Sequence, residues 1–169
     1  NALWLRADLG VVESGGTVTT WQDQSGNARD ATQGTVLAQP TKVAAELNGQ
    51  DVIRFDGSDD GLLLGDIGAA FPSAATLFVV STIGANEYAW NLVTTRNNDT
   101  WWRNADHNCY PGMFRLTRGA AYTTMPETGS HIFAVESSSS NWKMWIDGAG
   151  GVPATADYDG GDDFRIALN

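Results

Sequence analysis

Three aspartates stand close together in the stretch Arg54–Leu64, written RFDGSDDGLLL, between two apolar ends. Asp56, Asp59 and Asp60 could serve as catalytic acids, as calcium ligands or as turn residues. Calcium takes about six to eight oxygens from carboxylates, carbonyls and water, and Asp23, in an earlier polar turn, could add another carboxylate. Aspartate also caps nearby backbone amides in ordinary turns. We predict a strand-to-strand turn whose acids hold the backbone, with Ca2+ as the candidate cofactor and catalysis as the weakest interpretation.

A second cluster, polar and aromatic, occupies residues 97–107, NNDTWWRNADH. Sugar binding needs an aromatic face for the apolar side of a pyranose ring and polar groups for its hydroxyls. Adjacent Trp101 and Trp102 on a strand would point to opposite faces, so at most one of them would face a ligand while the other packs inward. The alternative is a solvated loop beside core aromatics. The candidate ligand-binding residues are Trp101, Trp102, Arg103, Asn104, Asp106 and His107.

The pattern of acidic and histidine residues argues against an enzyme. Glycoside hydrolysis uses two carboxylates about 5–5.5 Å apart or farther, yet the glutamates are scattered singly along the chain. No Ser-His-Asp arrangement or glycine-rich phosphate loop is recognisable. His131 opens a predicted strand and is interpreted as a structural or surface residue. A noncatalytic role is therefore predicted, and a glycan-cleaving hydrolase or lyase ranks third among the hypotheses.

Charge and hydropathy exclude further classes of partner. Ten basic and twenty acidic residues give a net charge of -10, which repels phosphate backbones and anionic lipid surfaces. No apolar run reaches the roughly 18–20 residues that span a bilayer. The single cysteine, Cys109, allows no intrachain disulfide. We expect neither nucleic-acid binding nor membrane insertion.

The elements that must position these residues are short strands. Apolar segments alternate with clusters of glycine, asparagine, aspartate and serine, as in chains of strands joined by turns. No stretch keeps a helical period beyond about two turns, so little helix is expected. The predicted strands are Ala2–Arg6, Val18–Trp21, Val52–Phe55, Leu62–Leu64, Thr76–Ile83, Trp90–Thr95, Met113–Leu116, His131–Glu136 and Trp142–Ile146.

Strand number and spacing predict one all-β domain over residues 1–169, built as two packed antiparallel sheets. Thr76–Ile83 is apolar through most of its length and is expected to be covered on both faces at the centre of the core. His131–Glu136 and Trp142–Ile146 are expected to form a hairpin. Trp90, Trp142 and Trp145 could stack on a ligand, but strand aromatics are mostly core residues, and that interpretation is favoured for them. Trp4 and Trp21 are also interpreted as core residues.

Four motifs in this order resemble the LamG-like jelly-roll domains of the concanavalin A-like lectin/glucanase superfamily. They are Leu3–Asp8 (LWLRAD), Trp21–Asn27 (WQDQSGN), Arg54–Gly61 (RFDGSDDG) and Trp145–Gly148 (WIDG). The resemblance implies a jelly-roll sandwich that is commonly a noncatalytic module of secreted or surface proteins, often sugar-binding and sometimes calcium-bound.

Three departures from the family pattern stand out. The family often has an aromatic residue where Gly61 stands, and its glucanases carry a Glu-x-Asp-x-x-Glu strand that this chain lacks. The usual closing strand, which returns beside the first one, would have to come from residues after Asn169. We therefore expect the domain to belong to a longer protein or to be completed by a neighbour.

We predict a carbohydrate-binding or adhesion module, located outside the cell, on a cell surface or on a virion surface. Its partners would be a glycan or neighbouring protein subunits. The main alternative is a structural spacer, filament subunit or virion decoration domain, in which surface aromatics meet protein.

Overall fold

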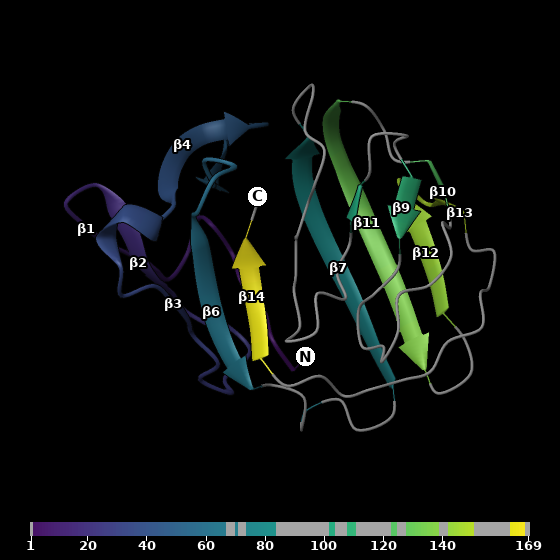
Figure 1. Cartoon of the computed structure of the whole chain (residues 1–169), viewed down its shortest axis with the longest axis horizontal. Coiled ribbons are helices and arrows are strands. Elements are labelled where there is room, and N and C mark those ends of the chain that lie inside the picture. The colour runs from purple at the N-terminus through teal and green to yellow at the C-terminus, as the bar shows by residue number, and fades with distance from the viewer. Residues whose placement is uncertain are drawn as a thin grey trace.

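Figure 1 shows a computed structural model of the chain, which describes residues 2–66, 70, 74–83, 102–103, 108–110, 123–124, 128–138, 142–150 and 163–167. Strands dominate these residues, and every strand pair is antiparallel. The described ranges contain no α-helix, and their 3-10 structure is short and includes η1 (Val36–Ala38). The expectation of an all-β chain with little helix is confirmed. Across the same ranges, no helix is long and apolar enough to cross a membrane.

One sheet has five strands in the order β1-β2-β3-β6-β14. Its strands are β1 (Val11–Ser14), β2 (Thr17–Trp21), β3 (Ala31–Thr32), β6 (Gly61–Asp66) and β14 (Asp163–Ala167). Side chains alternate across β6, where Leu62 and Leu64 are buried while Leu63 is 42% exposed. This sheet therefore has one face toward the core and one toward solvent.

The second large sheet has four strands in the order β13-β12-β11-β7. They are β7 (Ala74–Ile83), β11 (Gly129–Ser138), β12 (Trp142–Ile146) and β13 (Ala149–Gly150), and Figure 1 shows β7, β11 and β12 side by side. β11 and β12 pair from Ser137 with Trp142 to Phe133 with Ile146, so the predicted hairpin is confirmed. β11 lies between β12 and β7 and so organises this sheet.

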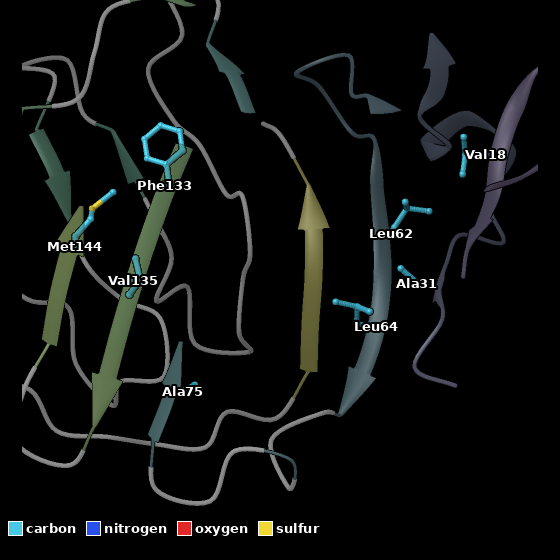
Figure 2. Close-up of a cluster of buried hydrophobic side chains, with 8 residues drawn as sticks. All are labelled: Val18, Ala31, Leu62, Leu64, Ala75, Phe133, Val135 and Met144. Carbon is cyan, nitrogen blue, oxygen red and sulfur yellow. The ribbon is translucent and has the colours of Figure 1, made fainter. Parts of the chain in front are cut away.

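Buried apolar side chains of the two large sheets form one hydrophobic cluster. Four come from the five-stranded sheet and four from the four-stranded sheet (Figure 2): Val18, Ala31, Leu62, Leu64, Ala75, Phe133, Val135 and Met144. Sheets that share a core in this way are consistent with a β-sandwich. The jelly-roll order of strands remains a prediction.

Two small sheets complete the described strands. β4 (Thr41–Leu47) pairs with β5 (Gln50–Arg54), and a sheet of order β10-β9-β8 joins β8 (Trp102–Arg103), β9 (Asn108–Tyr110) and β10 (Thr123–Thr124). The β4–β5 ribbon also carries two ion pairs, at 2.9 Å between Lys42 and Asp51 and at 2.6 Å between Arg54 and Glu46. Surface pairs of this kind contribute little to stability.

The N-terminal segment differs from its predicted strand. Residues 2–5 form no strand, and Arg6 makes only an isolated bridge with Leu9. Trp4 donates its backbone N–H to Asp23 Oδ1 at 2.9 Å and accepts from the Gln24 N–H at 2.7 Å. The Trp4 N–H is thus bonded to the Asp23 side chain rather than to the backbone of a neighbouring strand, and this apolar segment does not form a strand. Trp4 is also 46% exposed, so its assignment to the core was wrong.

The strand around Thr76–Ile83 forms as predicted, within β7, but its expected burial on both faces is wrong. Phe78 and Val80 are 71% and 63% exposed on its outer face. Among the described strands, β7 also lies at the edge of its sheet rather than at the centre. The predicted strands Trp90–Thr95 and Met113–Leu116 lie outside the described residues.

Candidate binding surface on the four-stranded sheet

Pairing register gathers large apolar side chains on the outer face of the four-stranded sheet. Ala134 in β11 stands opposite Phe78 in β7 and opposite Trp145 in β12. Paired residues of neighbouring strands share a face, so the two aromatic residues flank one small alanine. Two strand spacings place their Cα atoms roughly 10 Å apart.

A hollow of about 410 Å3 lies over this row, which we call the outer-face hollow. Its volume falls within the roughly 300–1,000 Å3 typical of small-ligand pockets. Trp145 is half-buried, while Phe78 is 71% exposed and Ile132 is 54% exposed. The lining residues are Thr76, Phe78, Ile132, Ala134, Glu136, Trp145 and Gly148.

The chemistry of the hollow is apolar in the middle and polar at one end. Glu136 stands opposite Thr76 on one side and opposite Lys143 on the other. A carboxylate accepts hydrogen bonds, and a hydroxyl both donates and accepts them. The surface therefore offers aromatic contact area next to groups that can bind hydroxyls.

The acidic turn connects β5 to β6 and has the structure that the sequence predicts. Asp56 Oδ1 accepts backbone N–H bonds from Ser58 at 2.8 Å, Asp59 at 3.3 Å and Asp60 at 3.4 Å. Asp60 Oδ2 accepts the Asp56 N–H at 2.9 Å in return. Gly57 takes a positive φ of 75°, which glycine adopts without steric cost. The prediction that acids of this stretch hold the turn is confirmed for Asp56 and Asp60.

The same aspartates also form a compact group of carboxylates. One oxygen from each of Asp56, Asp59 and Asp60 lies within 4.8 Å of the other two. Backbone amides, the Ser58 N–H first among them, lower the pKa of Asp56. Burial raises the pKa of Asp60, and the neighbouring charges of Asp56 and Asp59 add to that rise. The oxygen ligands suit Ca2+ in type, and calcium binding remains a prediction.

Asp23 does not belong to this group and instead holds the N-terminal segment. Its Oδ1 accepts N–H bonds from Trp4 and Ser25, each at 2.9 Å. Its Oδ2 accepts from the Ser25 hydroxyl at 2.7 Å and from the Arg29 N–H at 3.2 Å. Burial opposes ionisation, but these bonds together lower the pKa of Asp23. Both oxygens already have donors, so Asp23 acts here as a turn residue.

The predicted glycan-binding residues fall mostly outside the described part of the chain. Trp101, Asn104, Asp106 and His107 lie there. The backbone of Trp102–Arg103 forms β8, in which Trp102 pairs with Tyr110 and Arg103 with Cys109. The structure places a short strand at these two residues, which was not among the predicted strands, and the binding role of the cluster remains a prediction.

His131 precedes Ile132 in β11, and strand alternation puts its side chain on the face of Phe133, opposite the outer-face hollow. Its Nδ1 is 2.6 Å from Asp147 Oδ2, and its Nε2 is 3.1 Å from the Thr128 carbonyl oxygen. Its side chain is 17% exposed and makes an edge contact with Phe133. Because both ring nitrogens are engaged, this geometry fits the structural role that the sequence predicts.

Sequence reasoning missed the outer-face hollow. Trp145 was assigned to the core and Thr76–Ile83 to a doubly covered strand, whereas Trp145 and Phe78 share the outer face. The available signal was alternation in the hairpin, where Ile132, Ala134 and Glu136 fall on the face opposite Phe133 and Val135. Reading that alternation across the pairing would have put Trp145 outside.

Comparison with known proteins finds no family model, no curated protein and no solved structure that matches this chain. The resemblance to LamG-like domains therefore remains a prediction, and the functional argument depends on the geometry of the described residues.

Proposed function

We propose that this domain is a noncatalytic carbohydrate-binding or adhesion module that works at the outer-face hollow, outside the cell or on a cell or particle surface. The observation that carries the proposal is the pair Phe78 and Trp145 flanking Ala134 on one exposed sheet face. Aromatic side chains stack on the apolar face of a sugar ring, and a small residue between them leaves room for it.

The charge of the protein narrows the ligand class to uncharged glycans. A net charge of -10 disfavours sulfated or uronic polysaccharides over long range. Glu136 and Thr76 lie at the polar end of the hollow, where they can bind sugar hydroxyls. A neutral hexose or short neutral oligosaccharide is the ligand that this combination favours.

The lining residues support binding rather than cleavage. Glycoside hydrolysis requires two carboxyl groups facing one bond. Among the described residues that line the hollow, Glu136 is the only carboxylate. A hydrolase or lyase remains the third hypothesis, and a cleavage assay on the same glycans tests it.

A structural or adhesive role toward protein neighbours is the second candidate. Val80 extends the apolar surface beyond the hollow at 63% exposure. Contiguous exposed apolar surface is typical of protein–protein contacts. A neighbouring subunit could cover this face in a filament, spacer or particle coat.

A glycan screen of the purified domain, with calcium and with a chelator, tests the proposal. Trp145→Ala is expected to weaken binding at least about tenfold, since lost stacking and buried area exceed about 1.4 kcal/mol. Trp4→Ala is the matched control, because Trp4 is 46% exposed and does not line the hollow. Equal effects of the two variants, or no binding to any neutral glycan, would favour the protein-contact role. A loss of binding in chelator would show that calcium is required.

A further inference from the structure

Asp147 ties the turn between β12 and β13 to strand β11. Asp147 and Gly148 have φ angles of 52° and 80°, and Ile146 pairs with Ala149 across them, as in a two-residue hairpin turn. The Asp147 N–H donates to the Ile132 carbonyl at 2.9 Å, and Asp147 Oδ1 accepts the Ile132 N–H at 2.9 Å. The turn therefore has two backbone-directed bonds to β11.

A third hydrogen bond joins Asp147 to His131 in β11, and the contacts of the His131 ring require a particular charge state of the imidazole. The partners of its ring are a carboxylate oxygen of Asp147 at 2.6 Å and the carbonyl oxygen of Thr128 at 3.1 Å. Both are acceptors, so both ring nitrogens must donate. A neutral imidazole has one N–H and an imidazolium has two. The observed arrangement is complete only when His131 is protonated.

The surroundings of His131 favour that protonated form. The hydrogen bond to Asp147 is the main cause that raises the pKa of His131, and it outweighs partial burial, which lowers it. The same bond lowers the pKa of Asp147. On the neighbouring strand β7 the residue opposite His131 is the uncharged Ser81, and Phe133 contacts the ring edge. Within the described ranges, Asp147 is the only charged group against His131.

This hydrogen-bonded set adjoins two residues that line the outer-face hollow. Ile132, which Asp147 bonds through its backbone, lines the hollow, and so does Gly148, the residue after Asp147. We propose that protonated His131 latches the Asp147–Gly148 turn against β11. Loss of its proton removes the ion pair with Asp147 and one of the two ring hydrogen bonds, so that the hollow loosens next to this turn and ligand binding weakens. The effect on binding depends on the proposed function, whereas the latch itself does not.

The direction of the pH dependence follows from the raised pKa of His131. Since the pKa of His131 is higher in the folded protein than in the unfolded chain, its contribution to stability is complete below the ordinary histidine value of 6.5. That contribution is lost as the pH rises through the raised pKa. The hollow should therefore be best formed in mildly acidic to neutral surroundings.

The variant Asp147→Asn tests whether the turn depends on the charge of His131 or only on its hydrogen bonds. Asparagine tolerates the positive φ of this position, and its amide oxygen can still accept the Ile132 N–H. Its NH2 group can donate to Nδ1 of a neutral imidazole, which keeps its own Nε2–H for Thr128. The turn stays connected, but protonation of His131 is no longer favoured.

An NMR titration of the whole domain tests the latch without any ligand. We expect the His131 imidazole to titrate above 6.5, and the Ile132 and Gly148 amide signals to shift with the same midpoint. His131→Gln identifies the histidine signal. In Asp147→Asn the midpoint should fall, and the Gly148 amide should lose that transition. A wild-type midpoint at or below 6.5, or a Gly148 amide that ignores His131, overturns the proposal.

A second titration follows the affinity for the best neutral glycan of the screen. In the wild type, the affinity should fall as the pH rises, with the same midpoint as the His131 titration. In Asp147→Asn, the affinity should stay constant over the same pH range. A flat wild-type profile refutes the link between latch and hollow. If no glycan binds at any pH, the proposed function fails, and the amide titration still decides whether the latch exists.

Discussion

Phenylalanine occurs on both faces of the four-stranded sheet, which gives a direct test of whether the outer face is free. Phe133 is 0% exposed in the shared core, whereas Phe78, on the adjacent strand, is 71% exposed. Replacement by alanine removes the same atoms at both positions. The difference in the free energy of unfolding between Phe133→Ala and Phe78→Ala therefore measures burial.

The expected costs can be worked out from the exposed fractions. A phenylalanine carries about 200 Å2 of surface, and burial contributes about 25 cal/mol per Å2. Phe133→Ala should then lower the free energy of unfolding by about 4–5 kcal/mol, in the range for buried aromatic residues. Phe78 is 71% exposed, so about three tenths of its surface is covered and Phe78→Ala should cost at most about 1.5 kcal/mol.

Urea and thermal unfolding, followed by tryptophan fluorescence, measure both variants. In a chain of this size each 1 kcal/mol shifts Tm by roughly 2–4 °C. Phe133→Ala should lower Tm by about 8–20 °C and Phe78→Ala by less than about 6 °C. Equal losses would refute the reasoning, because they would mean that the outer face is covered in the folded protein and that no ligand can reach the hollow.

Two further predictions concern the acidic turn and the β12–β13 hairpin. Asp60→Asn should raise the free energy of unfolding at pH 7 in chelator, because burial raises the pKa of Asp60 and so penalises its charged form. The gain should vanish as the pH falls through that pKa and the wild-type carboxyl becomes neutral. Urea midpoints measured across the pH range test this. Gly150→Ala should destabilise the protein by more than about 1–3 kcal/mol, since φ is +122° and a Cβ would lie 2.7 Å from the Met144 carbonyl oxygen. Gly16→Ala, with φ at +91° and nothing within 4 Å, is the control that carries backbone strain alone.

The elements predicted correctly from the sequence are those whose residue pattern is contained within a few neighbouring positions. The β11–β12 hairpin, the strands around Leu62 and Thr76, and the turn between β5 and β6 all depend on alternation and turn chemistry within a few residues. These predictions were confirmed. β4 (Thr41–Leu47) was missed because it contains two alanines, a glutamate and a positive φ at Ala45, so that pairing with β5 decides its structure.

The candidate site was harder to predict because it is assembled across strands. Phe78 and Trp145 are far apart in the sequence, and only their common register with Ala134 brings them to one face. An apolar strand is equally compatible with burial on both faces, which is why Phe78 was expected inside. The latch has the same origin, since His131 and Asp147 meet only after the hairpin forms.

Successive residues of strand β11 have different roles. Phe133 and Val135 fill the core, while Ile132, Ala134 and Glu136 line the hollow. Substitutions at the second set can reshape the ligand surface while the residues that hold the two sheets together stay unchanged. Insertion of a single residue in this strand would instead exchange the two sets. The domain should therefore tolerate wide variation in specificity by substitution and very little by changes in the length of β11.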